Sequence, residues 1–410
     1  MMDDKASRVR GKLQQSKTKL DTLLNITNAI NNSFSKDSLF SLLQTVLTEN
    51  LNIAKLALFT LNSDTWNISI TKGVSAGVCD KIDVSYLIKS FPEIGIINRD
   101  EESKSLSQFD IAIPVFHHNK PFSFMLLADV DGEKLEISPI IKHLRFIQTL
   151  INIIVVALEN KRLNEQEIKQ AATNKELELA RNMQTLLFPK SLPNTNLLKV
   201  SAVYLPHSEV GGDYYDVISL SNNRTALCIA DVSGKGISAA LLMANFQANL
   251  RALVRIAGNL NELIEFCNQK VIESANFQKF ITLFIAIYDP NKRELSYVNC
   301  GHQPPLLIQE DGSSFLRTGS TVLGMFDQLP SLKTESLTIK KGDKLVCYTD
   351  GLTEMPDANG DQLEIEGIAT MLKNKKSLEE VVNTLENCIH KNGKYGDIDD
   401  DITFLTAQFL

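Results

Sequence analysis

The chain has 410 residues, of which 43% are hydrophobic and 22% are charged, and its net charge is −7. This composition is typical of globular proteins and excludes a fibrous or wholly disordered chain. At roughly 150 residues per domain, the length predicts two or three domains. An acidic chain has no general attraction to phosphate backbones, so we expect no nucleic acid among its partners.

The six cysteines form no CxxC pair, and the charged N-terminus is unlike a signal peptide. Both observations indicate reduced thiols in a cytoplasmic protein. The most apolar long stretch, residues 146–158, is shorter than the ~20 residues that cross a bilayer. We therefore expect no membrane span.

The first part of the chain alternates helical and strand-like patterns. Apolar residues at helical spacing predict helices over 17–32 and 39–49, the second capped by Asp37 or Ser38. A polar, Pro-containing turn between two apolar runs predicts a hairpin. The predicted strands are 54–61, 66–71, 110–116 and 122–128, followed by a helix over 139–158. This order predicts a small α+β sensory domain over residues 1–158.

Residues 159–192 differ in composition from the segments on either side. The stretch is rich in charges of both signs and lacks Gly and Pro before Pro189, which predicts a solvated helix ending near Phe188. Its apolar residues keep no strict heptad, so a coiled coil and an exposed connector helix both stay open.

Residues 193–410 predict antiparallel sheets covered by helices, because short turns join most of the strand-like runs. The predicted strands are 200–205, 215–220, 225–232, 280–288, 294–299, 305–309, 343–348 and 402–409. The predicted helices are 237–257, 260–275, 365–372 and 378–391.

Four acidic residues stand at strand ends or tight turns in this part. They are Asp213 in GGDYYD, Asp231 in ADVSGKG, Asp350 in TDGLTE and Asp400 in DDDIT. Carboxylate oxygens are the ligands that Mg²⁺ and Mn²⁺ prefer, and neighbouring glycines let backbone approach a cation or phosphate closely. A single Asp-Gly pair is more often only a turn.

Together these motifs, in this order, resemble the metal-dependent (type 2C) protein serine/threonine phosphatases, in their bacterial SpoIIE/RsbU branch. The resemblance runs from about Leu177 to Leu410 and includes the helix ending in LLFP, the FITLF strand and NCGHQPP. It implies an α/β/β/α sandwich of two packed antiparallel sheets over residues 193–410. Residues 1–158 are similar to a GAF domain by element order, so the chain as a whole is expected to be α+β.

The resemblance also implies a site for two divalent cations, Mn²⁺ or Mg²⁺. Asp231 would bridge them, the carbonyl of Val232 and the side chain of Asp213 would serve one, and Asp350 and Asp400 would hold the other. Asp399 and Asp401 are the alternatives to Asp400. Two cations about 3.5–4 Å apart activate a water for in-line attack on phosphorus, with no covalent enzyme intermediate.

This chain departs from the eukaryotic members at two positions. Ser233 stands where they carry a histidine that is proposed as the general acid. Residues 209–212, just before Asp213, contain no arginine in the place of their phosphate-binding one. Lys235 is a candidate for the phosphate contact, its alternative being a solvated turn lysine. His302 is expected to hydrogen-bond its own turn.

The implied function is hydrolysis of phosphoserine or phosphothreonine on a STAS-domain (anti-anti-sigma type) protein in a partner-switching pathway. The N-terminal domain would sense a ligand or regulatory protein, and a homodimer would form through Ile140–Leu187. Two alternatives stay open: a non-catalytic module that sequesters the phosphorylated partner, and a phosphatase of another substrate, including small molecules.

Overall fold

The computed structural model describes residues 2–62, 65–97, 105–117, 120–129, 138–356, 361–392 and 400–410. It divides into two compact units, residues 1–170 and 171–410. The boundary falls inside the predicted connector, 159–192. Each unit is described by itself.

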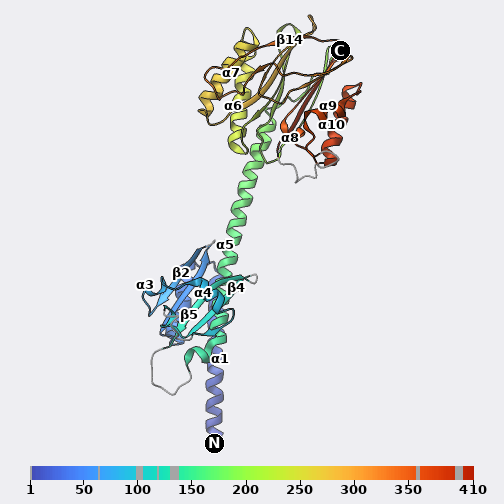
Figure 1. Cartoon of the computed structure of the whole chain (residues 1–410). Helices are drawn as coiled ribbons and strands as arrows, with labels where there is room; N and C mark the ends of the chain where they lie inside the picture. The colour runs from blue at the N-terminus through green and yellow to red at the C-terminus, as the bar shows by residue number, and fades with distance from the viewer. Residues whose placement is uncertain are drawn as a thin grey trace. The chain divides into compact units, whose positions relative to one another are not determined.

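The N-terminal unit is a five-stranded antiparallel sheet with helices on both faces (Figure 1). The strand order is β2-β1-β5-β4-β3. Its elements are α1 (Met2–Asn31), α2 (Lys36–Thr45), the π-helical turn η1 (Val46–Asn50), β1 (Lys55–Asn62), β2 (Thr65–Lys72), α3 (Ala76–Cys79), α4 (Val84–Ser90), β3 (Gly95–Ile96), β4 (Ile111–His117), β5 (Lys120–Ala128) and the start of α5 (Pro139–Thr185).

Both faces of this sheet are buried, because its strands carry unbroken apolar runs whose side chains alternate between the faces. On β5, Met125 and Leu127 pack against α1, α2 and α5, whereas Phe124 and Leu126 enter the core beneath α3 and α4. The GAF likeness of this unit stays a prediction.

Helix α5 is one continuous element and belongs to both units. Its first half packs into the N-terminal core through Ile147, Leu150 and Ile154. In the described part of the chain it is the one helix long and apolar enough to cross a bilayer. A core helix passes that test too, so this is weak evidence, and the predicted lack of a membrane span stays a prediction.

The C-terminal unit contains two sheets. One has the order β13-β10-β9-β8-β7, with β14 also pairing β10, and the other has the order β12-β11-β15-β16-β6. The strands are β6 (Leu198–Leu205), β7 (Tyr214–Ser219), β8 (Thr225–Val232), β9 (Ile281–Asp289), β10 (Glu294–Cys300), β11 (Leu306–Gln309), β12 (Gly312–Phe315), β13 (Gly319–Ser320), β14 (Glu335–Thr338), β15 (Lys344–Tyr348) and β16 (Ile402–Phe409).

The two sheets pack face to face and are flanked by helices, which makes a four-layer sandwich. Alternation on β15 shows the layers: Leu345 and Cys347 enter the core shared with the first sheet, and Val346 and Tyr348 face the outer helices. The first sheet is covered by α6 (Ile237–Leu253) and α7 (Leu260–Ala275), and the second by α8 (Asp350–Thr353), α9 (Glu364–Leu372) and α10 (Leu378–Asn392) (Figure 1). A short 3-10 turn, η3 (Ser221–Asn223), joins β7 to β8.

Several sequence predictions need correction. Helix α2 begins at Lys36 and is capped by Ser35, whose hydroxyl accepts the Ser38 N–H, instead of by Asp37 or Ser38. Helix α5 ends at Thr185, one turn before Phe188. The sheets are not wholly antiparallel, because the two-residue strand β13 pairs with β10 in parallel. Strands β12 to β14 were missed since they are short and largely polar.

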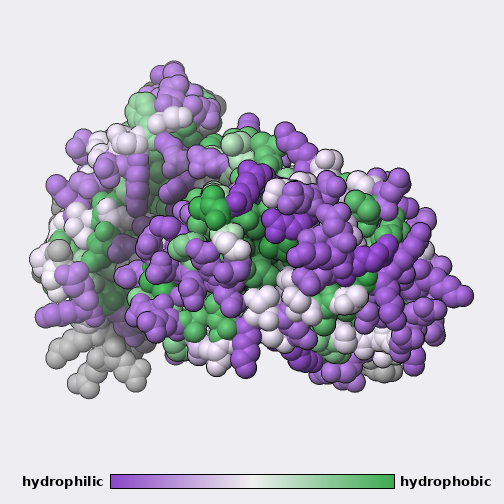
Figure 2. All heavy atoms as spheres, turned by 90° about the horizontal axis from the view of Figure 1, so that it is seen from above, coloured by the Kyte–Doolittle hydropathy of each residue, from purple (hydrophilic) through white to green (hydrophobic). Residues whose placement is uncertain are grey.

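The visible face in Figure 2 is mostly hydrophilic, with smaller hydrophobic areas between the polar side chains. Such a mixture is ordinary for soluble proteins, because polar side chains cannot cover a whole surface.

An ion pair between a fully buried carboxylate and a partly exposed arginine joins β7 to α6. The carboxylate of Asp216 is 0% exposed and accepts two hydrogen bonds from Arg251, from Nε at 2.5 Å and from Nη2 at 2.9 Å. The hydroxyl of Tyr214 donates to the same carboxylate at 2.5 Å.

Removing one partner of such a pair leaves the other charge without a counter-ion. We expect Arg251→Ala, which leaves the fully buried carboxylate of Asp216 without its cation, to lower the free energy of unfolding by about 3–5 kcal/mol, measured by urea unfolding of the full chain. The control is Lys340→Ala, which breaks the exposed pair with Asp311 and should cost far less, because solvent screens that pair. Equal losses in the two variants would contradict the assigned role of the pair between Asp216 and Arg251.

Candidate functional site

The four predicted acidic residues meet at one edge of the sandwich. Asp213 precedes β7 and Asp231 lies near the end of β8, and these antiparallel strands pair so that Tyr214 faces Ala230. Asp350 follows β15 and Asp400 precedes β16, and there Tyr348 faces Phe404. In an antiparallel pair the end of one strand lies beside the start of the next, so each sheet brings two acids to the shared edge.

Asp213 joins the two sheets. Its side chain is buried, and its Oδ2 accepts hydrogen bonds from the hydroxyls of Thr349, at 2.8 Å, and Thr403, at 2.5 Å. Both threonines belong to the second sheet, one after β15 and one on β16. Asp213 therefore stands behind the site, where it is tied to the strands that carry Asp350 and Asp400.

Asp400 and Asp401 have different surroundings although they are adjacent. Asp401 is buried and accepts the backbone N–H groups of His207 and Gly212, each at 2.8 Å. Asp400 is half-buried, and its Oδ2 lies 3.0 Å from the ammonium of Lys235. Asp401 is thus engaged in holding the 207–213 loop, which favours Asp400 as the ligand. Asp399 lies outside the described residues.

The same loop is held from its other side by α5. The side-chain amide of Gln184 donates to the carbonyl oxygen of Gly211 at 2.7 Å and accepts the Gly211 N–H at 3.2 Å. A side chain at 211 is excluded, because a Cβ would stand 2.2 Å from Asp401 Oδ2 and 2.3 Å from the Tyr204 hydroxyl. The loop before Asp213 is therefore clamped between Gln184 and Asp401.

Crowded carboxylates dominate the electrostatics of the site. Burial, and then the charges of Asp350, Asp400 and Asp401, raise the pKa of Asp231 to about 7. Burial and the charge of Asp231 raise the pKa of Asp213 well above its ordinary value. Burial and Asp400 also raise the pKa of Asp350. Without a counter-charge, ionising this cluster is costly.

These raised pKa values set the pH dependence of stability in metal-free protein. A carboxyl whose pKa rises on folding binds more protons in the folded state, so its stabilisation is complete below pH ~4 and is lost as pH rises through its folded pKa. For Asp231 that window ends near pH 7. We expect the Asp231 contribution to lower the free energy of unfolding, with EDTA present, by a few kcal/mol between pH ~4 and ~7 and to change it little above pH 7.

Thermal unfolding from pH 4 to 8 measures this effect. Asp231→Asn should flatten the slope, since the asparagine does not titrate. Added Mn²⁺ should also flatten it if the cation binds the ionised carboxylates. A slope that is unchanged in Asp231→Asn would place the titrating group elsewhere.

A cavity of about 140 Å³ opens beside Asp231 and Asp350, lined also by His302. The backbone N–H of His302 donates to Asn299 Oδ1 at 2.8 Å, so the residue hydrogen-bonds its own turn as predicted, but it also lines this cavity, which the prediction of a turn role did not include. Its ring Nδ1 lies 2.8 Å from the hydroxyl of Thr282, which faces Asp231 across β8 and β9. Burial lowers the pKa of His302 to about 3, so the ring is neutral at physiological pH.

Ser233 holds the turn after β8. Its hydroxyl accepts the Phe280 N–H at 2.9 Å, and its carbonyl oxygen accepts a hydrogen bond from Lys279 Nζ at 2.8 Å. Lys235, the candidate phosphate contact, has its ammonium beside Asp400. It places one positive charge where the carboxylates are most crowded.

The residues fit divalent cations by their chemistry. The clustered acidic side chains all offer hard oxygen donors. The backbone adds the carbonyl oxygen of Val232 beside Asp231. Both lie close to Gly212, since a Cβ there would stand 2.9 Å from that carbonyl oxygen and 3.5 Å from Asp231 Oδ1. Within the described ranges, no three acidic, histidine or cysteine side chains converge into a finished ligand set. A cation would draw these carboxylates closer together.

Sequence reasoning missed Gln184, Thr349 and Thr403 as supports of the site. The two threonines stand inside TDGLTE and DDIT, so those motifs contained them without showing their role. Gln184 carried no local signal, because its partner Gly211 is 27 positions away in the chain.

Comparisons with known proteins agree with this geometry. Residues 221–410 match the family described as stage II sporulation protein E (SpoIIE), a range that contains Asp231, Asp350 and Asp400. The chain is 28% identical over 248 residues to the phosphoserine phosphatase RsbU of Bacillus subtilis. These matches indicate a SpoIIE-type PP2C phosphatase domain within the C-terminal unit.

Two further comparisons show how much of this chain and of its relatives the similarity covers. The chain is 29% identical over 276 residues to protein IcfG of Synechocystis sp.. The matches cover 60% of this chain in both cases, and 71% of RsbU but only 42% of IcfG. The PP2C domain of SiaA from Pseudomonas aeruginosa superposes with a TM-score of 0.51 at 17% identity, covering 59% of this chain and 99% of that one, which shows the shared fold.

Proposed function

We propose that this protein is a metal-dependent phosphatase that hydrolyses phosphoserine or phosphothreonine on a STAS-domain protein. The observation that carries the proposal is the meeting of Asp231, Asp350 and Asp400 at one edge of a SpoIIE-type PP2C domain. The name phosphoserine phosphatase, which RsbU and RsbP of B. subtilis both carry, supports the reaction class.

The proposed roles are those that the resemblance implies. Asp231 would be shared by the two cations, the carbonyl of Val232 and the side chain of Asp213 would serve one, and Asp350 and Asp400 would hold the other. When bound, the two cations acidify a water and neutralise charge on the phosphoryl oxygens. Asp213 is held by Thr349 and Thr403, so it acts chiefly by fixing the edge of one sheet against the other.

Lys235 is the exposed, positively charged member of the site. Its ammonium is paired with Asp400, and its side chain is 55% exposed. In the proposed reaction this ammonium would contact a phosphoryl oxygen of the substrate. His302 stays neutral and orients Thr282 beside Asp231, which keeps that side of the cavity uncharged.

The substrate and setting come from the resemblance to the SpoIIE/RsbU branch. A phosphorylated STAS protein would be the partner, in a bacterial partner-switching pathway in the cytoplasm. The N-terminal unit would be a GAF-like sensor that controls activity. Helix α5 would be the dimer contact through Ile140–Leu187, and it presents exposed Ile168, Leu179 and Met183 after the N-terminal core ends.

The test is phosphate release from a phosphorylated STAS protein of the same genome, titrated with Mn²⁺ and Mg²⁺. We expect release that depends on the cation and stops with EDTA. Mn²⁺ binding without release from any phosphoprotein offered would favour the sequestering module instead. Release from p-nitrophenyl phosphate but from no phosphoprotein would favour a small-molecule phosphatase.

A further inference from the structure

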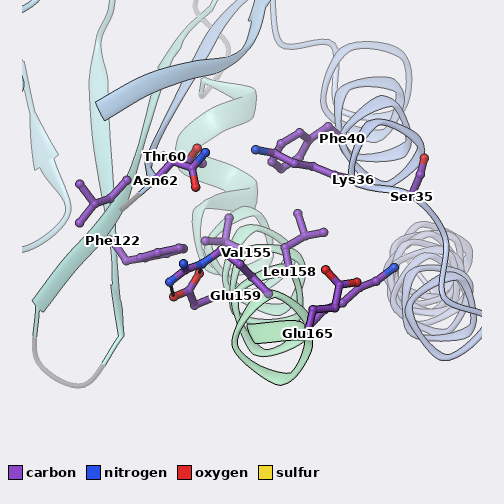
Figure 3. A pocket seen from close by; sticks show the side chains of 13 residues that line it. Ser35, Lys36, Phe40, Thr60, Asn62, Phe122, Val155, Leu158, Glu159 and Glu165 are labelled. Carbon is purple, nitrogen blue, oxygen red and sulfur yellow. Dashed lines mark hydrogen bonds and ion pairs between the residues drawn. The ribbon is translucent and has the colours of Figure 1, made fainter. Parts of the chain in front are cut away.

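The N-terminal unit contains a cavity of about 440 Å³, well separated in the chain from the acidic site. Its volume is within the usual range of ~300–1,000 Å³ for small-molecule pockets. Figure 3 shows side chains from four elements around one space: Lys36 and Phe40 of α2, Thr60 and Asn62 of β1, Phe122 of β5, and Val155, Leu158 and Glu159 of α5.

The cavity forms where the core packing of α5 ends. Val155 still belongs to the apolar core, with Leu158 packed against it, and one turn later the same side of the helix carries charge. Glu159 is only 7% exposed at its side chain, and it accepts hydrogen bonds from Arg162 Nε at 2.8 Å and Nη2 at 2.6 Å. Burying the Glu159 carboxylate is costly unless it is paired, and Arg162, whose side chain is 35% exposed, supplies that pair from the pocket lining.

The pocket offers one surface for an apolar body and another for a negative charge. Phe40, Phe122 and Leu158 provide the apolar walls. Arg162 is neutralised by Glu159, whereas Lys36 has no carboxylate within 4 Å among the described residues. Its ammonium instead lies 5.5 Å from the centre of the Phe40 ring and points across the pocket toward Thr60 and Asn62 (Figure 3).

We propose that this pocket binds a small organic anion with an apolar or aromatic body. The acid group pairs with Lys36, the amide of Asn62 contributes hydrogen bonds, and the body packs between Phe40 and Phe122. Six of the lining residues belong to α5, from Val155 to Glu165. The bound molecule therefore contacts the helix whose last turn carries Gln184, which makes this pocket an effector site.

The site is tested by direct binding to the full chain, independent of phosphatase activity. The probe is 8-anilinonaphthalene-1-sulfonate, an aromatic anion whose fluorescence rises in apolar surroundings. We expect one saturable site. Lys36→Glu should weaken it at least tenfold, since the variant replaces an attractive charge with a repulsive one. An acidic residue at the first position of α2 favours the helix, so the variant should fold.

Two further variants make the test decisive. Lys81→Glu makes the same charge change at an exposed position that does not line the pocket, and it should leave probe affinity within twofold. Leu158→Trp fills the cavity with a larger apolar side chain and should abolish the saturable site. Probe affinity that is the same in all three variants, or the absence of a saturable site in the unmodified protein, would overturn the proposal.

Discussion

Replacing Asp231 by asparagine is expected to abolish phosphate release, by at least about 10³-fold, without unfolding the protein. The carboxylate lies among Asp350, Asp400 and Asp401, and the proposed function assigns the bridging role to it. An amide has one neutral oxygen to offer a cation, so the variant loses the charge that would draw two cations together. A 10³-fold loss corresponds to about 4 kcal/mol of transition-state stabilisation.

The same substitution should have the opposite effect on metal-free stability. The raised pKa of Asp231, about 7, means that its ionised form is disfavoured in the folded state. A neutral isostere removes that penalty, so we expect Asp231→Asn to be at least as stable as the unmodified protein at pH 8 with EDTA. Loss of activity together with unchanged or increased thermal stability separates a role in the reaction from a role in folding.

Asp311→Asn is the matched control, because it makes the same change at an exposed residue paired with Lys340. It should retain both phosphate release and Mn²⁺ affinity, measured by calorimetry. If Asp231→Asn kept more than a tenth of the activity, or bound Mn²⁺ as tightly as the control, the bridging assignment would be wrong.

The regular elements of the C-terminal unit were largely predictable. Strand β8, strand β16 and helix α7 have the bounds that apolar periodicity indicated, 225–232, 402–409 and 260–275. These segments are long, apolar on the buried side, and bounded by turns or capping residues such as Asn259, whose side chain accepts the Glu262 N–H. Local pattern and tertiary environment agree there, and in such segments sequence reasoning is most dependable.

The predictions failed where a segment depends on its neighbours. Strand β14 is a short, largely polar segment that is extended because it pairs with β10 in an antiparallel ladder. Helix α1 extends back to Met2, far beyond the apolar pattern that begins near residue 17, and no Pro interrupts it. Neither feature has a local apolar signal.

At the site, the family resemblance ranked Asp400 above Asp399 and Asp401, whereas residue type alone could not separate them. Asp400 and Asp401 carry identical chemistry, and what distinguishes them is geometry: Asp401 accepts backbone N–H groups of a loop nearly 190 positions earlier, including Gly212. The supports of Asp213 are likewise distant in sequence. Contacts of this kind follow from the packing of two sheets, which residue spacing does not encode.

Gln184 links α5 to the site, and Gln184→Leu is expected to lower phosphate release at least tenfold while also weakening Mn²⁺ binding. Leucine has nearly the same size but leaves the buried N–H and carbonyl of Gly211 without partners, at about 1–3 kcal/mol for each group. The 207–213 loop would relax, and it carries Asp213 and the close approach of Gly212 to the Val232 carbonyl. Cation affinity should therefore fall together with the rate.

The comparison variant is Gln170→Leu, the same change on the same helix at an exposed position. It tests whether any added apolar residue on α5 disturbs the protein, and it should leave both measurements unchanged. Gln184→Glu should lie between the two, because it keeps the acceptor for the Gly211 N–H and loses the donor to the carbonyl. Equal activity and Mn²⁺ affinity in Gln184→Leu and Gln170→Leu would show that the hydrogen bonds to Gly211 do not position the loop. A graded loss across the three would establish that the end of α5 sets the geometry of the acidic site, which is the physical connection that control of this enzyme by its N-terminal unit requires.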